Sequence, residues 1–387
     1  MGLAVLIGVV LATVGCGSKA PIEKSTGVSE GVDVGSPAAS SPAASSPDAS
    51  SPAASSPEVS SPERGPLGSG EAVTLAFAGD ASFQGLGAAA SADPGGLLSA
   101  VAPVLSDADV TMINLETAVG SGGSPEPKAF NFQAPAAVLD SLSSAGVDVV
   151  TMANNHAMDF GLDGLRATLD IKAKSKIAIL GVGADATEAY TPHIATVRGQ
   201  RIGFLAFNDV FDSSLVAKWT AGDGKPGIAS SKTSHADRVT AAVAALRQQV
   251  DTLVVYLHYG TETQTCPNSR QKELVEQLSA AGADIIVGSH AHRLQGVGYL
   301  GDKLVAYGLG NFIFRAPSAP GRQSGVLKVT ATGARIDSFK WIPAEIRGEV
   351  PVPLTGEAAT RAAGEMATLQ TCADLTVEPS GGARKGN

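Results

Sequence analysis

The sequence predicts an α/β fold for the part of the chain that follows residue 70. Two observations lead to this prediction: short apolar segments alternate with helical ones, and several apolar segments end in polar side chains. The expected strands are Val73–Ala78, Val110–Leu115, Val147–Ala153, Ile177–Val182, Ile202–Phe207, Thr252–Leu257, Asp284–Val287, Lys303–Tyr307 and Gly325–Thr330. The expected helices lie near Ala136–Ser144, Leu162–Ser175, Ser234–Gln249 and Ser269–Ala281.

Composition narrows the class of protein. The chain has 387 residues, 28 Lys and Arg against 37 Asp and Glu, and a formal net charge of −9. An acidic chain without a basic block is unsuited to binding nucleic acid through its phosphates. Three cysteines exclude a disulfide-dense scaffold. We therefore expect one large domain over residues 71–378, followed by a disordered tail at 379–387.

The N-terminus predicts export. Residues 2–15 are almost wholly apolar and end at Cys16, a length typical of a signal-peptide core and short for a transmembrane helix. The segment TVGCGS resembles a bacterial lipoprotein cleavage site, which implies a lipid on Cys16 and a protein anchored to the membrane at the bacterial cell surface. Thr13 stands where Leu is usual, and no basic residue precedes the apolar run. An ordinary signal peptide or an uncleaved anchor therefore remains an alternative.

A low-complexity segment follows the leader. Residues 17–70 contain repeats of the type SPAASSP, and proline at this frequency blocks both helix and sheet. Such Pro/Ala/Ser tracts act as semi-extended spacers. We expect residues 17–70 to be a disordered linker that holds the folded domain away from the membrane.

Polar residues collect where five of the expected strands end. They are Asp80, Glu116, Asn154, Asn155, His156, His258, His290 and His292. In open α/β sheets the carboxyl edge is where ligands bind. Oxygen and imidazole donors together suit divalent metals such as Zn, Mn or Fe. The set is larger than one ion needs, so the pattern favours a two-metal site.

The ordered segments GDAS, NLE, ANNHAMDFG, LHYGTE, GADIIVGSHAH and YGLGNFIF resemble the CapA (PgsA-like) poly-γ-glutamate biosynthesis family. That family belongs to the calcineurin-like metallophosphoesterase superfamily, and the resemblance covers residues 72–314. It implies a four-layered α/β/β/α sandwich with two divalent ions, Mn, Zn, Fe or Mg, at the loop edge. It also implies a role in the biosynthesis or export of an anionic polymer, with such a polymer or a phosphoester as substrate and membrane polymer-synthase subunits as partners.

The resemblance also implies roles for individual residues. The metal ligands would be Asp80 and His292 for the first ion, His258 and His290 for the second, Asn155 as a further ligand, and Glu116 as the bridge. His156 would stabilise or protonate the leaving oxygen, and Asp159 would orient its imidazole.

Three positions depart from the superfamily pattern. Ser82 stands in place of a histidine ligand, Glu116 in place of an aspartate, and Ala157 where an acid usually follows the Asn-His pair. The missing imidazole weakens one metal position. Two functions therefore remain open: a metal-dependent hydrolase, and a non-hydrolytic factor that binds or assembles the polymer.

Other residues have weaker signals. Asn154, Arg293 and Asn311 are expected to contact substrate, although Gly-Asn is also a common turn and an arginine near a site is often only solvated. Once Cys16 is set aside, Cys266 and Cys372 remain. An extracytoplasmic protein would allow a disulfide between them, and two separate buried thiols are the alternative.

Overall fold

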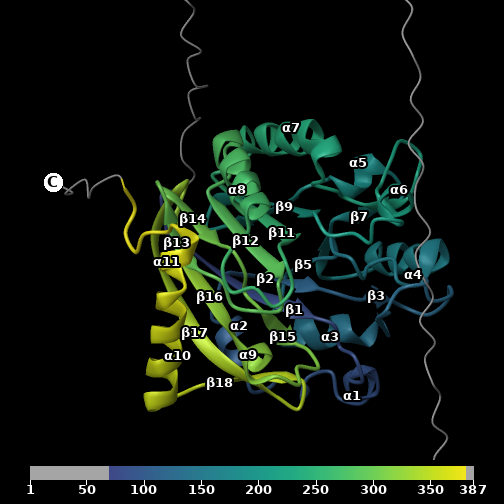
Figure 1. Ribbon diagram of the computed structural model, residues 1–387, viewed down its shortest axis with the longest axis horizontal. Helices are drawn as coiled ribbons and strands as arrows, with labels where there is room; N and C mark the ends of the chain where they lie inside the picture. The colour runs from purple at the N-terminus through teal and green to yellow at the C-terminus, as the bar shows by residue number, and fades with distance from the viewer. Residues whose placement is uncertain (1–68, 381–387) are drawn as a thin grey trace, which may run out of the picture. The chain divides into compact units, whose positions relative to one another are not determined.

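The computed structural model describes residues 69–380, in which two large β-sheets are stacked with helices outside them (Figure 1). The first sheet has the order β18-β17-β16-β1-β2-β5-β6, with β15 beside β1. Its strands are β1 (Val73–Ala81), β2 (Val110–Leu115), β5 (Val149–Thr151), β6 (Ala178–Leu180), β15 (Asn311–Ile313), β16 (Gln323–Thr332), β17 (Arg335–Arg347) and β18 (Val350–Pro353). The leader at 1–16 with Cys16, the linker up to residue 68 and the tail from 381 lie outside the described residues.

The second sheet has the order β13-β14-β12-β11-β9-β8. Its strands are β8 (His193–Val197), β9 (Gln200–Asn208), β11 (Thr252–Tyr259), β12 (Ile285–His290), β13 (Val297–Leu300) and β14 (Lys303–Ala306). Two small pairs complete the strands of the described part: β3 (Ala118–Val119) with β4 (Gln133–Ala134), and β7 (Val182–Gly183) with β10 (Gly227–Ile228).

Most helices lie in the connections between strands, and the last two follow the final strand. The helices are α1 (Gly87–Ala92), α2 (Ala102–Leu105), α3 (Ala137–Ser144), α4 (Gly161–Lys172), α5 (Ala186–Ala189), α6 (Val216–Trp219), α7 (Ala236–Arg247), α8 (Ser269–Ala281), α9 (Ala319–Arg322), α10 (Gly356–Thr368) and α11 (Gln370–Ala373), with a 3₁₀ turn at Thr233–His235. β1, β2, β5 and β6 are parallel neighbours in chain order, as are β9, β11 and β12. Because such crossovers are right-handed, each set of connecting helices lies on one face of its sheet.

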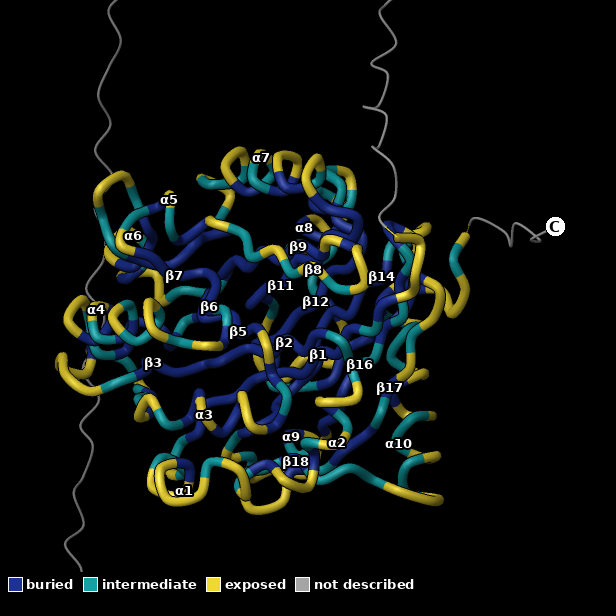
Figure 2. The backbone as a smooth tube through the Cα atoms, turned by 180° about the vertical axis from the view of Figure 1, so that it is seen from behind, coloured by how far each residue is buried: buried dark blue, intermediate teal, exposed yellow. Residues whose placement is uncertain are grey.

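The core shows which faces of the sheets meet. Phe204 and Tyr256 of the second sheet pack in one apolar cluster with β1 and β2 of the first sheet. Leu205 and Val255, one position along the same strands, pack in a second cluster with α7 and α8. Side chains alternate between the two faces of a strand, so the second sheet is buried on both sides. The layers are therefore α/β/β/α, as predicted, and Figure 2 shows the buried strands between the more exposed helices.

Eight of the nine expected strands and all four expected helices are present; β2 and α8 have the expected ends, and the ends of the others are shifted. The segment expected as one strand at Ile177–Val182 is instead divided between β6 and β7. Gly181 separates them with φ +83°, and a Cβ there would lie 2.4 Å from the Cβ of Ala153. The glycine therefore ends the first strand and lets the chain turn closely over the loop that follows β5.

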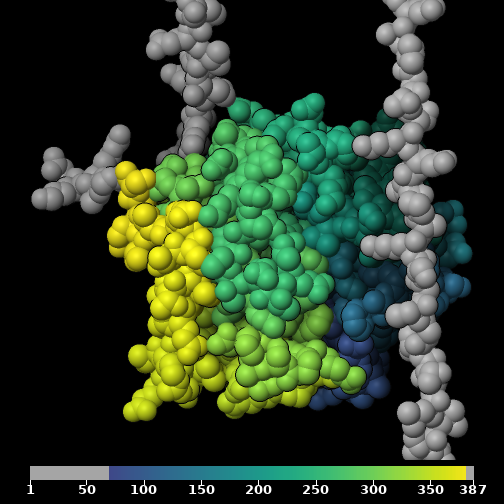
Figure 3. All heavy atoms as spheres, in the orientation of Figure 1, coloured from purple at the N-terminus to yellow at the C-terminus, as the bar shows by residue number. Residues whose placement is uncertain are grey.

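The C-terminal helices α10 and α11 lie along one side of the described part, next to strands of both sheets (Figure 3). A disulfide joins Cys372 in α11 to Cys266 in the loop after β11, with their Cα atoms 5.6 Å apart. It ties the C-terminal segment to a loop that begins at the candidate site. Among the described residues, no helix combines the length and apolar character that crossing a membrane requires.

Candidate metal centre

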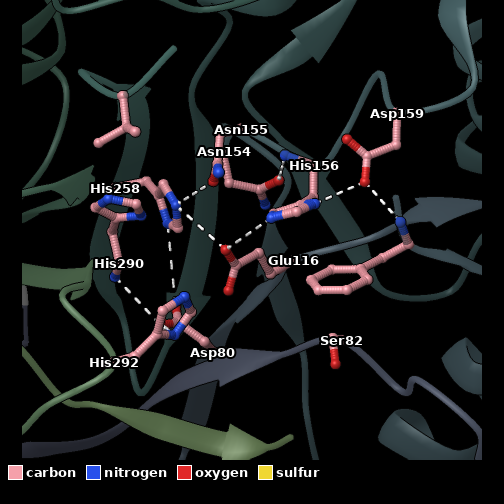
Figure 4. Close-up of polar contacts among 12 residues, drawn as sticks. Asp80, Ser82, Glu116, Asn154, Asn155, His156, Asp159, His258, His290 and His292 are labelled. Atoms are coloured by element: carbon pink, nitrogen blue, oxygen red, sulfur yellow. Dashed lines mark hydrogen bonds and ion pairs between the residues drawn. The ribbon is translucent and has the colours of Figure 1, made fainter. Parts of the chain in front are cut away.

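The two sheets bring their carboxyl ends together. Asp80 near the end of β1 pairs in register with Asn114 on β2 and with Asn311 on β15. His258 near the end of β11 pairs with Ser289, and Tyr259 pairs with His290 on β12. Parallel strands in register deliver their last side chains to one edge, which explains why residues far apart in sequence meet there. Figure 4 shows Asp80, His258 and His290 converging on one space.

The backbone at this edge adopts conformations that cost free energy. His290 has φ +88° and His292 has φ +51°, values that residues with a side chain adopt only infrequently. Gly79 allows β1 to approach the segment just before β15, because a Cβ there would lie 1.9 Å from the carbonyl oxygen of Gly310. Strained backbone of this kind concentrates at functional sites, and here it occurs at two histidines whose ring nitrogens lie close to Glu116.

One group of ligands surrounds His258. Its Nε2 lies 2.7 Å from Asn155 Oδ1 and 3.4 Å from Glu116 Oε1. On the other ring nitrogen, Nδ1 lies 3.1 Å from Asn114 Nδ2 and 3.2 Å from Ser289 Oγ. Nε2 thus faces the ligand group, and the tautomer that binds a metal through Nε2 carries its proton on Nδ1, where the Ser289 hydroxyl can accept it.

A second group surrounds Asp80. Its Oδ2 lies 3.2 Å from His292 Nδ1 and accepts a hydrogen bond from the backbone N–H of His290. Its Oδ1 accepts a hydrogen bond from Asn114 Nδ2 at 2.8 Å. Donor atoms of Glu116, His290 and His292 lie within 4.8 Å of one another. Glu116 thus belongs to both groups, as expected for a bridging residue.

Buried atoms without partners provide a test of whether a metal fits. Both carboxylate oxygens of Glu116 and Nδ1 of His290 are buried and make no hydrogen bond within the protein. A buried carboxylate left without a partner is strongly unfavourable. Because carboxylate and imidazole are common metal ligands, the residues present fit a divalent cation.

Electrostatics support the same interpretation. Burial, followed by the charge of nearby Asp80, raises the pKa of Glu116 well above its ordinary value. Burial, followed by the charge of His292, lowers the pKa of His290 to about 3. Burial, followed by the charge of His290, lowers the pKa of His258 well below its ordinary value. These two imidazoles are therefore neutral near pH 7, the form that binds metals.

The remaining imidazole of this cluster behaves differently. Burial opposes the charge of His292, but Glu116 and the hydrogen bond to Asp80 raise its pKa to about 9. Burial would also raise the pKa of Asp80, but the hydrogen bond and charge of His292 lower it below the ordinary value. Without a metal, His292 therefore carries a proton and forms an ion pair with Asp80.

His156 is held from the opposite side. Its Nδ1 lies 2.6 Å from Asp159 Oδ2, and its ring stacks on Phe132 with centroids 4.1 Å apart. Its Nε2 faces the ligand group at 3.8 Å from Glu116 Oε1. Burial lowers the pKa of His156, partly offset by the hydrogen bond to Asp159. The geometry therefore places Asp159 where it can orient this imidazole, although two residues after the position where the acid is usual.

The three residues expected to contact substrate form hydrogen bonds to other residues of the site. Asn154 is fully buried and bonds to Asn114, to the carbonyl of Leu115 and to the N–H of His156, so it supports the loop instead of facing a substrate. Asn311 Oδ1 lies 2.8 Å from His292 Nδ1, which makes this amide a support for that imidazole. Arg293 donates to the carbonyl of His292 and is half-buried beside the site.

Ser82 does not join the ligand group. Its backbone N–H donates to the carbonyl of Ile313, and its hydroxyl lies 3.4 Å from the N–H of Gln84. Figure 4 shows its side chain apart from the cluster of imidazoles and carboxylates. One ligand position of the superfamily is therefore not filled by the residue at this place in the sequence.

Sequence reasoning missed three residues of the site: Asn114, Lys128 and Phe132. Asn114 connects Asp80, Asn154 and His258, and its signal was an amide inside the otherwise apolar segment VTMINL. Lys128 and Phe132 come from a loop rich in Gly, Ser and Pro, where spacing gives no indication of a contact with His156.

The layered fold therefore places a group of carboxylate and imidazole side chains that could hold a metal ion at the ends of its strands. The family model described as bacterial capsule synthesis protein PGA_cap matches residues 74–316. The match covers more than half of the chain, and the chain belongs to this family.

Curated relatives include the "PGA biosynthesis protein CapA" of Bacillus subtilis (strain 168), 31% identical over 55% of this chain and 54% of the relative. The "Capsule biosynthesis protein CapA" of Bacillus anthracis is 27% identical over 66% of this chain and 62% of the relative. The chain thus spans less than two thirds of these relatives' length.

Two solved structures are similar at a lower level. One is a hypothetical protein from Thermus thermophilus, with 16% identity, a TM-score of 0.46, and coverage of 70% of this chain and 99% of that chain. The other is a putative 5'-nucleotidase from Staphylococcus aureus in complex with alpha-ketoglutarate. It has 14% identity, a TM-score of 0.45, and coverage of 77% of this chain and 58% of that chain.

Proposed function

We propose that this protein is a metal-dependent hydrolase that acts on a phosphoester or related bond during the synthesis or export of a poly-γ-glutamate-type capsule polymer. The names of the curated relatives support the polymer context. The observation that supports hydrolysis is the buried Glu116 carboxylate, which makes no hydrogen bond within the protein and is faced by imidazoles. A site built in this way is suited to two divalent ions that share Glu116.

The proposed location follows from the N-terminal sequence. A lipid on Cys16 would anchor the chain to the outer face of the cell membrane, and residues 17–70 would act as a spacer. The site would then be placed outside the cell, near the membrane subunits that make or export the polymer. A net charge of −9 does not favour broad contact with a polyanion, so contact would be concentrated at the metals and at Arg293.

Each part of the site has a task in this proposal. Asp80, Glu116, Asn155, His258, His290 and His292 would hold the ions. Bound divalent ions supply Lewis-acid polarisation of a phosphoryl or acyl oxygen. His156 presents Nε2 to the space beside Glu116, while Asp159 holds Nδ1. As the bond to the leaving oxygen breaks, His156 protonated at both ring nitrogens would stabilise that oxygen or give it the Nε2 proton, and the neutral imidazole that remains would keep its Nδ1 proton on Asp159.

The test is the variant His156→Ala, assayed on a chromogenic phosphoester such as p-nitrophenyl phosphate with Mn²⁺ supplied. We expect kcat to fall roughly 10²–10⁴-fold, the usual contribution of a positioned acid or base, while bound metal stays unchanged. His235→Ala is the matched control because His235 lies on the 3₁₀ turn before α7, outside the site. Wild-type turnover that persists in His156→Ala would contradict the role assigned to this residue.

A second function is favoured by one observation. Ser82 lies apart from the ligand group, so the first metal position lacks an imidazole that the superfamily pattern supplies. A site weakened in this way would suit a factor that grips polymer carboxylates without hydrolysis. In that case wild-type protein would show no turnover on any phosphoester, and His156→Ala would bind poly-γ-glutamate as tightly as wild type.

A further inference from the structure

A loop between β3 and β4, residues 120–132, lies against the Asn155–Asp159 segment, and its contacts depend on one buried lysine. We call this loop the strap. The side chain of Lys128 is only 7% exposed. Its Nζ donates to the backbone carbonyl of Asn155 at 2.6 Å and to Asp159 Oδ1 at 2.8 Å. One cation thus contacts the main chain of an expected metal ligand and the carboxylate that orients His156.

The strap also fixes the other oxygen of the same carboxylate. Asp159 Oδ2 accepts a hydrogen bond from the backbone N–H of Phe132 at 2.6 Å while it holds His156 Nδ1. The ring of Phe132 stacks on the imidazole at an interplanar angle of 18°. Stacking on Phe132 therefore fixes the plane of the His156 ring, and the hydrogen bond to Asp159 fixes the direction in which Nδ1 points.

The lysine is itself well supported. Its Nζ lies 5.2 Å from the centre of the Trp219 ring, within the range of a cation–π contact. The neighbouring Lys218 forms an ion pair with Glu126 of the strap, and the N–H of Glu126 donates to the carbonyl of Asp159. Several contacts therefore hold the flexible side chain of Lys128 in one place. A side chain that positions another group must itself be held in this way.

We propose that Lys128 is a positioning residue that fixes Asn155 and His156 relative to each other, through the Asn155 carbonyl and through Asp159. Lys128 also compensates for the position of Asp159, which lies two residues later than the usual acid. Asp159 Oδ2 reaches His156 only when Lys128 anchors Asp159 Oδ1. Any effect of Lys128 on turnover rests on the proposed function. Its effect on the positions of Asn155 and His156 holds with or without hydrolysis.

The experiment compares the full-length variants Lys128→Met and Lys218→Met with wild type. Lys218→Met is the matched control, because it also removes a lysine–carboxylate pair from the strap but contacts neither Asp159 nor His156. The first measurement is ¹⁵N-histidine NMR of metal-free protein, with the His156 signal assigned by its loss in His156→Ala. We expect a protected Nδ1–H of His156 in wild type and Lys218→Met, and its loss in Lys128→Met.

The second measurement is Mn²⁺ affinity by calorimetry. We expect binding about tenfold weaker in Lys128→Met, since loss of an outer contact to a ligand commonly has this effect, and a smaller loss in Asp159→Asn, where Lys128 keeps its contact with the Asn155 carbonyl. The double variant Lys128→Met/Asp159→Asn removes both charges and provides a folded comparison if the single lysine variant does not fold. It is expected to bind Mn²⁺ about tenfold more weakly than Asp159→Asn alone.

An unchanged His156 Nδ1–H signal in Lys128→Met would overturn the proposal, as would equal Mn²⁺ affinities in the double variant and Asp159→Asn. These failures differ from failure of the proposed function. A wild-type protein that turns over no phosphoester would remove the hydrolase proposal while leaving the NMR comparison fully decisive for Lys128.

Discussion

The two sides of the candidate centre differ in how their polar atoms are satisfied. On the His156 side, both oxygens of Asp159 have partners in Lys128, Phe132 and His156 itself. On the opposite side, both oxygens of Glu116 are buried without a hydrogen bond. The first side is complete within the protein, whereas the second depends on a group that the protein must bind. This difference separates residues that maintain the fold from residues that hold a ligand.

The largest change in stability is expected on the His156 side, where the polar atoms of Asp159 all have partners within the protein. Asp159→Ala removes one partner of a buried ion pair and leaves Lys128 uncompensated. We expect the free energy of unfolding to fall by about 3–5 kcal/mol, measured by urea denaturation. Asp163→Ala is the control because its pair with Arg166 is exposed, and it should change stability little. A loss no larger than that of the control would show that the His156 side is not held as described.

At Glu116, in contrast, we expect a substitution to increase the free energy of unfolding. Glu116→Gln replaces a buried carboxylate that lacks a hydrogen bond with a neutral side chain of the same shape. In protein treated with a chelator, we expect stability to rise by about 1 kcal/mol, since residues kept for ligand binding often destabilise the fold. Glu262→Gln, at an exposed position, should leave stability unchanged. A destabilised Glu116→Gln variant would indicate that Glu116 has a structural partner.

A smaller effect is expected in the pH dependence of metal binding on the Glu116 side. The pKa of His292 is raised to about 9 and that of Glu116 is also raised, so both groups tend to hold protons when no metal is bound. Metal ligands must lose such protons, and binding therefore releases them. We expect Mn²⁺ affinity to increase as pH rises from about 7 toward 9. Calorimetry in buffers of different ionisation enthalpy measures the release, and binding without proton release would contradict it.

Much of the fold was predictable because strands buried on both faces read as continuous apolar runs, as at Thr252–Leu257. Other elements gave weaker signals. β17 contains Pro343 and alternates apolar with charged residues, and α10 buries only Met366 on one face. Two-residue strands such as β3 depend on tertiary contacts that no local pattern records.

The site was predictable for the same reason that it forms. Residues such as Asp80 and His258 follow apolar strands directly, so topology alone brings them together. The residues that support them were not predictable in this way. Lys128 lies in an irregular loop, and its contact with Asp159 spans 31 positions that no period connects. Asn154 and Asn311 were identified as part of the site, but only the structure shows that Asn154 supports the backbone at His156 and that Asn311 supports the imidazole of His292.

We infer that the Glu116 side of the centre exists to hold metal. This claim is tested most directly by the metal content of the purified full-length chain after supply of Mn²⁺ or Zn²⁺, compared with the variant His258→Ala/His290→Ala. We predict about two ions per chain in wild type and loss of both in the variant, because these imidazoles complete a centre shared through Glu116. A wild-type chain that binds no ion under these conditions would contradict the claim.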